Sequence, residues 1–380
     1  MSVIRNVRKF VTISTGALAI LSPALAESPK AMPFPHENSD LKPDPSVRFG
    51  KLENGVRYAI MKNEEPPKRV SMRLHIDAGS LAEEEDQRGI AHFLEHMAFN
   101  GTKNFKPDEL VTFLQSNGIA FGAHLNAYTS FDETVYMLDL PDNRDELIEK
   151  GLLVISDWAD GMLLLKDQVD HERGVILSEK RDRDSVEFRL MEKQFSELLP
   201  ETLLSKRMPI GLEEVISNAD RQRFVDFYET NYSPDRTTVV IVGDIDVDVM
   251  EQRVRDLFGK MEPLEARIPD PKLGNITTFD GIKTIVESDS ELKSTDVEIV
   301  NILPYEATVD SAAQRAADMP ISIAYAMLNS RLSILAKQED AEFTSASASE
   351  FDMFDTATFA MMNVTAKGND WQSAMLVALG

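Results

Sequence analysis

Two histidines and a glutamate within five consecutive residues could bind a metal ion and use it. His92, Glu95 and His96 belong to the segment His-Phe-Leu-Glu-His. On a helix, residues four apart share one face with a rise of about 6 Å between them, so both imidazoles can reach one ion. Three protein ligands leave zinc a position for water, whose pKa the ion lowers to about 7. We therefore predict one Zn2+ ion per chain, with Glu95 as general base in peptide hydrolysis.

The third ligand must come from elsewhere in the chain, and spacing leaves several candidates open. Glu172 and Glu179 are seven residues apart on a helix that we expect over residues 167–198. This separation is about 10.5 Å along the axis, so only one of them can bind the ion directly while the other supports the site from outside the ligand set. His124 and His171 compete for the same place, although an isolated histidine more often serves in hydrogen bonding.

The histidine pair needs a rigid helix, and the surrounding sequence predicts one. Apolar residues recur at helical spacing over residues 90–99, and Asn100-Gly101 is a typical helix end. An acidic run at residues 83–86 precedes this helix. It would interact favourably with the helix N-terminus, but a solvated surface explains the run equally well.

The remaining patterns predict strands and helices arranged in layers. Asn54-Gly55 indicates a hairpin, and strand patterns follow at residues 70–76, 121–129, 134–140 and 236–242. Helices are expected at residues 107–117, 143–160, 167–198 and 247–258. Further along, strand-like segments occur at 283–287, 296–303, 343–348 and 358–365. A helical region at 311–337 is interrupted near Pro320, and a new helix begins near Trp371. Mixed strands and long helices imply an α+β fold.

Composition suggests where this α+β chain divides. Residues 263–275 combine prolines, glycine and charges, which is typical of a linker. We therefore predict a zinc-binding domain at residues 45–262, a linker at 263–275, and a partial second α+β domain at 276–380.

The N-terminus carries a secretory signal pattern. Arg5, Arg8 and Lys9 precede an apolar run that ends in Ala24-Leu25-Ala26. The run is too short and too often interrupted for a membrane span of about 20 residues. We expect a signal peptide at residues 1–26, cleaved after Ala26, and a periplasmic or secreted protein without stable membrane insertion. Residues 27–44 contain many prolines and are expected to be a disordered leader.

Charge and the absence of cysteine narrow the classes of partner. Lys and Arg number 40 against 64 Asp and Glu, which gives a formal net charge of -24. Such a field repels phosphate backbones and anionic lipid headgroups, so nucleic acid is not an expected partner. Because the chain has no cysteine, it can form neither a disulfide framework nor a lipid attachment site.

The segment at residues 89–99, Gly-Ile-Ala-His-Phe-Leu-Glu-His-Met-Ala-Phe, closely resembles the pitrilysin/insulinase family, the inverzincins, whose signature is H-x-x-E-H. Residues 125–130, 134–136, 172–179, 232–234 and 242–244 also look like segments of that family, and the resemblance extends over about residues 45–265. It implies two-layer α/β domains of the pitrilysin and mitochondrial-processing-peptidase type.

The resemblance also assigns roles. It implies His92, His96 and Glu179 as zinc ligands, Glu95 as general base and Glu172 as a helper outside the ligand set. Asn126 and Ala127 would pair with the extended backbone of a peptide or unfolded polypeptide substrate. Family members enclose such substrates in a chamber, so a C-terminal half or a second chain would close it here. The alternative is a non-catalytic peptide-binding or partner subunit of a two-chain peptidase.

Overall fold

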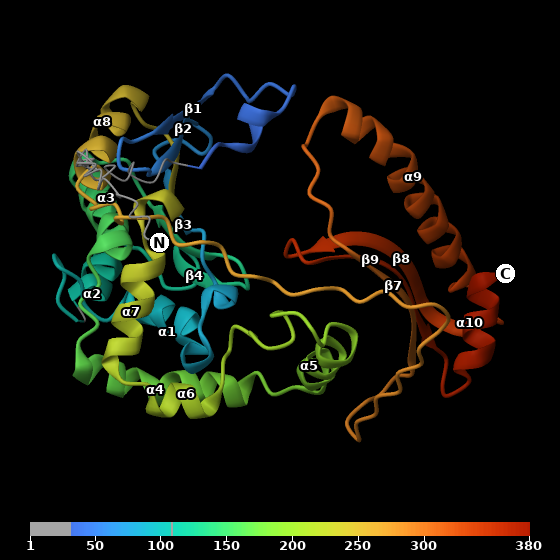
Figure 1. Ribbon diagram of the computed structural model, residues 1–380. Helices are drawn as coiled ribbons and strands as arrows, with labels where there is room; N and C mark the ends of the chain where they lie inside the picture. Colours follow the sequence, from blue (N-terminus) through green and yellow to red (C-terminus); the bar gives the residue numbers. More distant parts are fainter. Residues whose placement is uncertain (1–31, 108) are drawn as a thin grey trace, which may run out of the picture.

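The computed structural model describes residues 32–107 and 109–380, which form two β-sheets with helices packed on them (Figure 1). The predicted signal peptide at residues 1–26 and the start of the predicted leader lie outside the described residues. The expected α+β fold class is confirmed.

The first sheet contains six strands in the order β1-β2-β6-β3-β5-β4. The strands are β1 Val47–Lys51, β2 Arg57–Lys62, β3 Val70–Ile76, β4 Leu125–Thr129, β5 Thr134–Leu140 and β6 Thr237–Gly243. All neighbours are antiparallel except the parallel pair β2–β6. Gly55 adopts a φ of 112° in the β1–β2 turn, which explains the Asn54-Gly55 hairpin signal. Strand β4 lies at the edge of the sheet.

Alternating side chains bury one face of this sheet under helices. Val70, Met72, Leu74 and Ile76 of β3 are all buried, whereas the residues between them are partly exposed. Helices α1 (Ile90–Met97), α3 (Asp145–Asp160) and α8 (Val247–Phe258) pack against strands of the sheet. The same strands and helices share one large apolar core. The sheet therefore gives α1 a rigid base.

Trp158 of α3 fixes the C-terminal end of α1. Its indole is fully buried, stacks on Tyr136 and donates a hydrogen bond of 3.0 Å from Nε1 to the carbonyl of Ala98, which follows α1. Trp158→Phe should lower the free energy of unfolding by about 1–3 kcal/mol, because the Ala98 carbonyl loses its donor in a buried place.

Urea unfolding would measure this loss, with Trp371→Phe as matched control. Trp371 is the other tryptophan of the chain and is 46% exposed. Its replacement should change the unfolding free energy by less than about 0.5 kcal/mol. Equal losses in the two variants would contradict the supporting role of Trp158.

The helix expected at residues 167–198 is two helices. Helix α4 spans Lys166–Asp182 and α5 spans Val186–Leu198. The hydroxyl of Ser185 accepts a hydrogen bond of 3.2 Å from the amide of Phe188 and starts α5. A serine at this point offers the backbone an alternative to continuing the first helix, so the single-helix prediction was wrong. The shorter helices α2 (Glu109–Ser116), α6 (Glu213–Asn218) and α7 (Arg221–Asn231) complete this part of the fold.

The second sheet has three antiparallel strands in the order β7-β9-β8. These are β7 Asp296–Pro304, β8 Phe343–Met353 and β9 Ala357–Ala366, with α9 (Ala312–Leu335) packed on β8 and α10 (Trp371–Leu379) packed on β9. Pro320 lies inside α9, and the helix continues through it. The expected interruption was wrong, because a proline removes one intrahelical hydrogen bond that the flanking turns of a long helix can tolerate.

The connection between the sheets lies against α5 and the loop that follows it. The amide of Leu203 donates to the carbonyl of Leu273 at 2.8 Å, and Arg189 pairs with Asp289 at 3.0 Å. Residues 283–287 form no strand, contrary to expectation, since they run beside α5 and have no strand to pair with. An apolar cluster joins the two parts of the chain and includes Leu81, Phe131, Leu199, Leu204, Ala357 and Phe359. The domain limits 45–262, 263–275 and 276–380 remain a prediction.

Part of the predicted disordered leader is ordered. Residues 35–38 form a short 3-10 helix, Phe34 is buried against Phe49 of β1, and Glu37 pairs with Lys51 at 2.7 Å. The proline-rich composition suggested disorder, but aromatic contacts of Phe34 and His36 with Phe49 and the ion pair of Glu37 hold this segment on the sheet. Within residues 32–107 and 109–380, no helix is both long and apolar enough to cross a bilayer.

Candidate metal centre

The two histidines lie on one face of α1, as their spacing requires. Their ring centroids are 5.0 Å apart, with the ring planes at 82°. Seven of the eight residues of α1 are buried, and the adjacent Phe93 packs on Phe224 of α7 with ring centroids 4.7 Å apart. The helix therefore cannot rotate without breaking its core contacts, and the two imidazoles are held in place.

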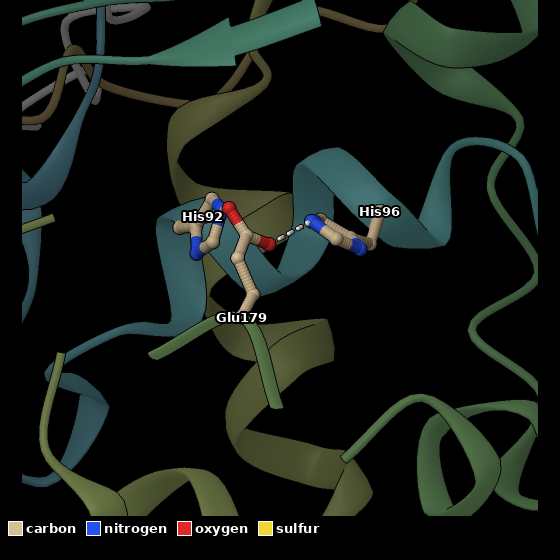
Figure 2. A group of neighbouring side chains, drawn as sticks. All are labelled: His92, His96 and Glu179. Atoms are coloured by element: carbon tan, nitrogen blue, oxygen red, sulfur yellow. Dashed lines mark ion pairs between the residues drawn. The ribbon is translucent and has the colours of Figure 1, made fainter. Parts of the chain in front are cut away.

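Glu179 comes to the histidines from α4, which packs against α1. Its Oε1 lies 3.6 Å from Nε2 of His92, and its Oε2 lies 3.3 Å from Nε2 of His96 (Figure 2). One ligand atom from each of the three residues can be chosen so that all lie within 4.8 Å of one another. Tetrahedral ligands about 2.0–2.2 Å from zinc are about 3.3–3.6 Å apart, which the two distances between Glu179 and the histidines match, and two imidazoles with one carboxylate are donors that zinc takes.

Glu172 supports His96 rather than joining the ligands. Glu172 lies on α4, which packs against α1, and its Oε1 lies 2.9 Å from Nδ1 of His96. Its Oε2 accepts a hydrogen bond of 2.8 Å from Nδ2 of Asn100. This contact leaves Nε2 of His96 free for a metal ion, in the carboxylate–histidine–metal order common in zinc sites.

Glu95 lies one residue before His96 with its carboxylate largely buried. Its Oε2 accepts a hydrogen bond of 2.8 Å from the hydroxyl of Thr129 at the end of β4. Burial raises the pKa of Glu95, and the Thr129 hydrogen bond opposes this rise. Thr129 thus orients one oxygen of the Glu95 carboxylate.

The pKa values of the two histidines shift in opposite directions. Burial lowers the pKa of His92, and the neighbouring His96 lowers it further. Burial would also lower the pKa of His96, but hydrogen bonds to Glu172 and Glu179 outweigh it and raise the pKa to about 9. The hydrogen bond with His96 lowers the pKa of Glu179.

The other candidates from the sequence lie outside this group. His171 is exposed on α4, and His124 accepts a hydrogen bond of 3.3 Å at Nδ1 from the amide of Ala120. Among the described residues, neither belongs to a group that could hold a metal. Asn126 and Ala127 lie on β4, whose only strand partner in the described chain is β5. On the outer side of β4, the backbone of Leu125 is bonded to residues 120–122, and the amide of Ala127 donates to the side-chain oxygen of Asn126 at 3.0 Å. An added strand would therefore pair with β4 beyond Leu125 and replace the contact of the Ala127 amide.

Three contacts of the site escaped the sequence analysis. Asn100 and Arg183 each lie four residues after a ligand, and Arg183 pairs with Glu179 at 2.5 Å. Helical spacing could have indicated both, because residues four apart share one face of a helix. Thr129 reaches Glu95 through the fold, and no local signal marks it.

Comparison with known proteins gives two adjoining family matches. Residues 58–208 match the model described as insulinase (peptidase family M16), and residues 218–377 match the model of the peptidase M16 inactive domain.

Among curated proteins, the chain is 35% identical over 274 residues to "Probable zinc protease PqqL" of Haemophilus influenzae, which covers 72% of this chain and 29% of that protein. The crystal structure of the first half of the periplasmic protease PqqL from Escherichia coli has a TM-score of 0.81 at 28% identity, over 89% of this chain and 72% of that one. The structure of the periplasmic protease PqqL from the same organism also gives 0.81, at 27% identity, over 89% and 38%. The chain thus spans less than a third of the first of these relatives.

Proposed function

Because the chain belongs to the insulinase family, peptidase family M16, we propose that it carries the zinc centre of an endopeptidase for short or unfolded peptides. The observation that supports this most is the convergence of His92, His96 and Glu179 within 4.8 Å. Glu95 lies on the same helix, with one carboxylate oxygen held by Thr129. A ligand set together with a buried base is what metal-assisted hydrolysis needs.

In this proposal each side chain has a separate task. Bound zinc would supply a Lewis acid that activates water and polarises the peptide carbonyl. Glu95 would take the proton of the attacking water at Oε1 and pass it to the leaving amine. Glu172 and Asn100 would keep the ring of His96 turned so that Nε2 faces the ion. Thr129 would hold the Glu95 carboxylate against rotation.

The edge strand β4 is the proposed place for the substrate backbone. Asn126 and Ala127 would form main-chain hydrogen bonds with an extended peptide that adds to the first sheet next to β4. Such pairing requires a free backbone, so a folded protein domain could not use it. Short peptides and unfolded segments are therefore the proposed substrates.

The relatives and the N-terminal sequence support a proposal for where the protein is located and how its site is enclosed. The Escherichia coli structures are described as a periplasmic protease, and the sequence begins with a secretory signal pattern. We place the protein in the periplasm. Since the chain spans 29% of one relative, we propose that a later segment or second chain closes a chamber over β4.

The first test is metal removal. A purified preparation should contain one zinc ion per chain, and it should lose hydrolysis of a fluorogenic unfolded peptide after dialysis against a chelator. Added zinc should restore the rate, because zinc-activated water has no substitute in the site. Rates before, after and on reconstitution measure this directly, and a zinc-containing chain with chelator-insensitive hydrolysis would refute the proposal.

The alternative is a non-catalytic partner subunit, and the same preparation distinguishes the two. That function predicts a chain without zinc and without hydrolysis, found in a stable complex with an active second chain. Zinc analysis together with the solution mass therefore decides between them.

A further inference from the structure

Glu83 is a buried carboxyl group at the start of the helix that carries the metal ligands. Glu83 is only 4% exposed, whereas its neighbours Glu84, Glu85 and Asp86 are exposed. The acidic run thus contains one residue that no solvated surface explains. Oε1 of Glu83 accepts hydrogen bonds of 2.9 Å from the amides of both Gly89 and Ala91.

Among the described residues, Glu83 is the only hydrogen-bond acceptor of these two amides. Gly89 precedes α1 with a φ of 105° and has no side chain to cap the helix. The first amides of a helix lack intrahelical partners, and leaving a buried one unpaired costs about 1–3 kcal/mol. Glu83 supplies the missing acceptor from six residues upstream. Burial raises the pKa of Glu83 to about 8 despite these hydrogen bonds, so the group is largely uncharged at neutral pH.

The contacts around Glu83 extend to the second ligand helix. The guanidinium of Arg207 donates from Nε to the carbonyl of Glu83 at 3.0 Å. Gly211, four residues later, lies so close to Gly89 that a Cβ on it would come within 2.3 Å of the Gly89 Cα. The carbonyl of Gly211 accepts a hydrogen bond of 2.8 Å from Nζ of Lys180, the residue after Glu179. One junction therefore ties the start of α1 to α4 at the third ligand.

We propose that Glu83 is a positioning residue of the zinc centre, which holds the first turn of α1 so that His92 stands where it can share an ion with Glu179. Ala91, whose amide Glu83 binds, is adjacent to His92 in the chain. Productive metal sites require ligands held to within about 0.5 Å. A first turn without its acceptor would shift Ala91 and move the His92 ring with it.

The test compares an acceptor-retaining variant with one that lacks an acceptor. Glu83→Gln keeps an oxygen of similar reach and should retain zinc affinity. Glu83→Leu removes the acceptor and should weaken zinc binding by about 10- to 100-fold, as replacement of supporting groups around metal sites does. Competition with a chromophoric chelator measures the affinity. The visible absorption of the Co2+-substituted protein reports ligand geometry and should change only in Glu83→Leu. Glu84→Leu, at an exposed neighbour, is the matched control.

Two results from folded variants would overturn the positioning role of Glu83. Glu83→Leu with the affinity and Co2+ spectrum of the unchanged protein would overturn the proposal, as would Glu83→Gln with the losses of Glu83→Leu. If Glu83→Leu does not fold, Glu83→Asp takes its place, since its acceptor is one methylene shorter. Failure of both to fold would assign Glu83 to the fold as a whole and overturn the positioning role. The proposal rests on the zinc site above: an unchanged protein that binds no zinc refutes that function instead.

Discussion

Replacement of Glu95 by glutamine should lower kcat/KM for an unfolded peptide by about 10²- to 10⁴-fold, the usual loss when a general base is removed. The amide keeps the size of the carboxylate and can still accept the hydrogen bond from Thr129, which is 2.8 Å long in the native residue. It cannot take a proton from water at neutral pH. The variant should therefore fold and keep one zinc ion, because Glu95 does not belong to the ligand group.

A matched control separates loss of the base from loss of a negative charge. Glu146 on α3 has an 82% exposed side chain, so Glu146→Gln makes the same chemical change away from the site. Its steady-state rates should equal those of the unchanged protein. A Glu95→Gln variant with full activity, or one that has also lost its zinc, would remove Glu95 from the role of base.

Much of the fold was accessible from local patterns because burial imposes them. The period-two alternation in β3 and the helical spacing of apolar residues in α1 both reflect one buried face, and the structure places both elements near their predicted limits. The predictions from sequence were wrong where one side chain, or the absence of a neighbouring strand, determined the local structure. Ser185 starts a new helix, and residues 283–287 have strand-like composition but no strand beside them.

The site shows the same division between local and long-range information. Helical spacing is a local property, so the pairing of His92 with His96 could be predicted. The choice between Glu172 and Glu179 depends on how α4 crosses α1, which spacing does not determine. The surroundings of Glu83 include Arg207, which donates to its carbonyl from 124 residues away in the sequence. Because Glu83 belongs to a run of acidic residues, the sequence did not distinguish it as the one that bonds the start of α1.

The two glutamates of α4 should respond differently to the same substitution. Glu179→Gln replaces a carboxylate, one oxygen of which faces Nε2 of His92 and the other Nε2 of His96, with a neutral amide, which is a poor zinc ligand. We expect this variant to lose stoichiometric zinc and, with it, hydrolysis. Glu172→Gln changes a group that contacts Nδ1 of His96 and Nδ2 of Asn100 but lies outside the ligand set, and its amide oxygen can still accept the hydrogen bond of His96. Its zinc affinity should fall by no more than about 10- to 100-fold.

Competition with a chelator of known affinity would rank the two variants, and the ranking follows from charge as well as geometry. Hydrogen bonds to Glu172 and Glu179 outweigh the burial of His96 and raise its pKa to about 9, which shows how strongly these carboxylates favour a positive charge at the site. Glu179 is the carboxylate that would contact a bound zinc ion directly. Removing its charge thus removes both a ligand and the electrostatic attraction for the cation, whereas Glu172 acts only through the imidazole. If Glu172→Gln lost more zinc than Glu179→Gln, the roles of the two residues would have to be exchanged.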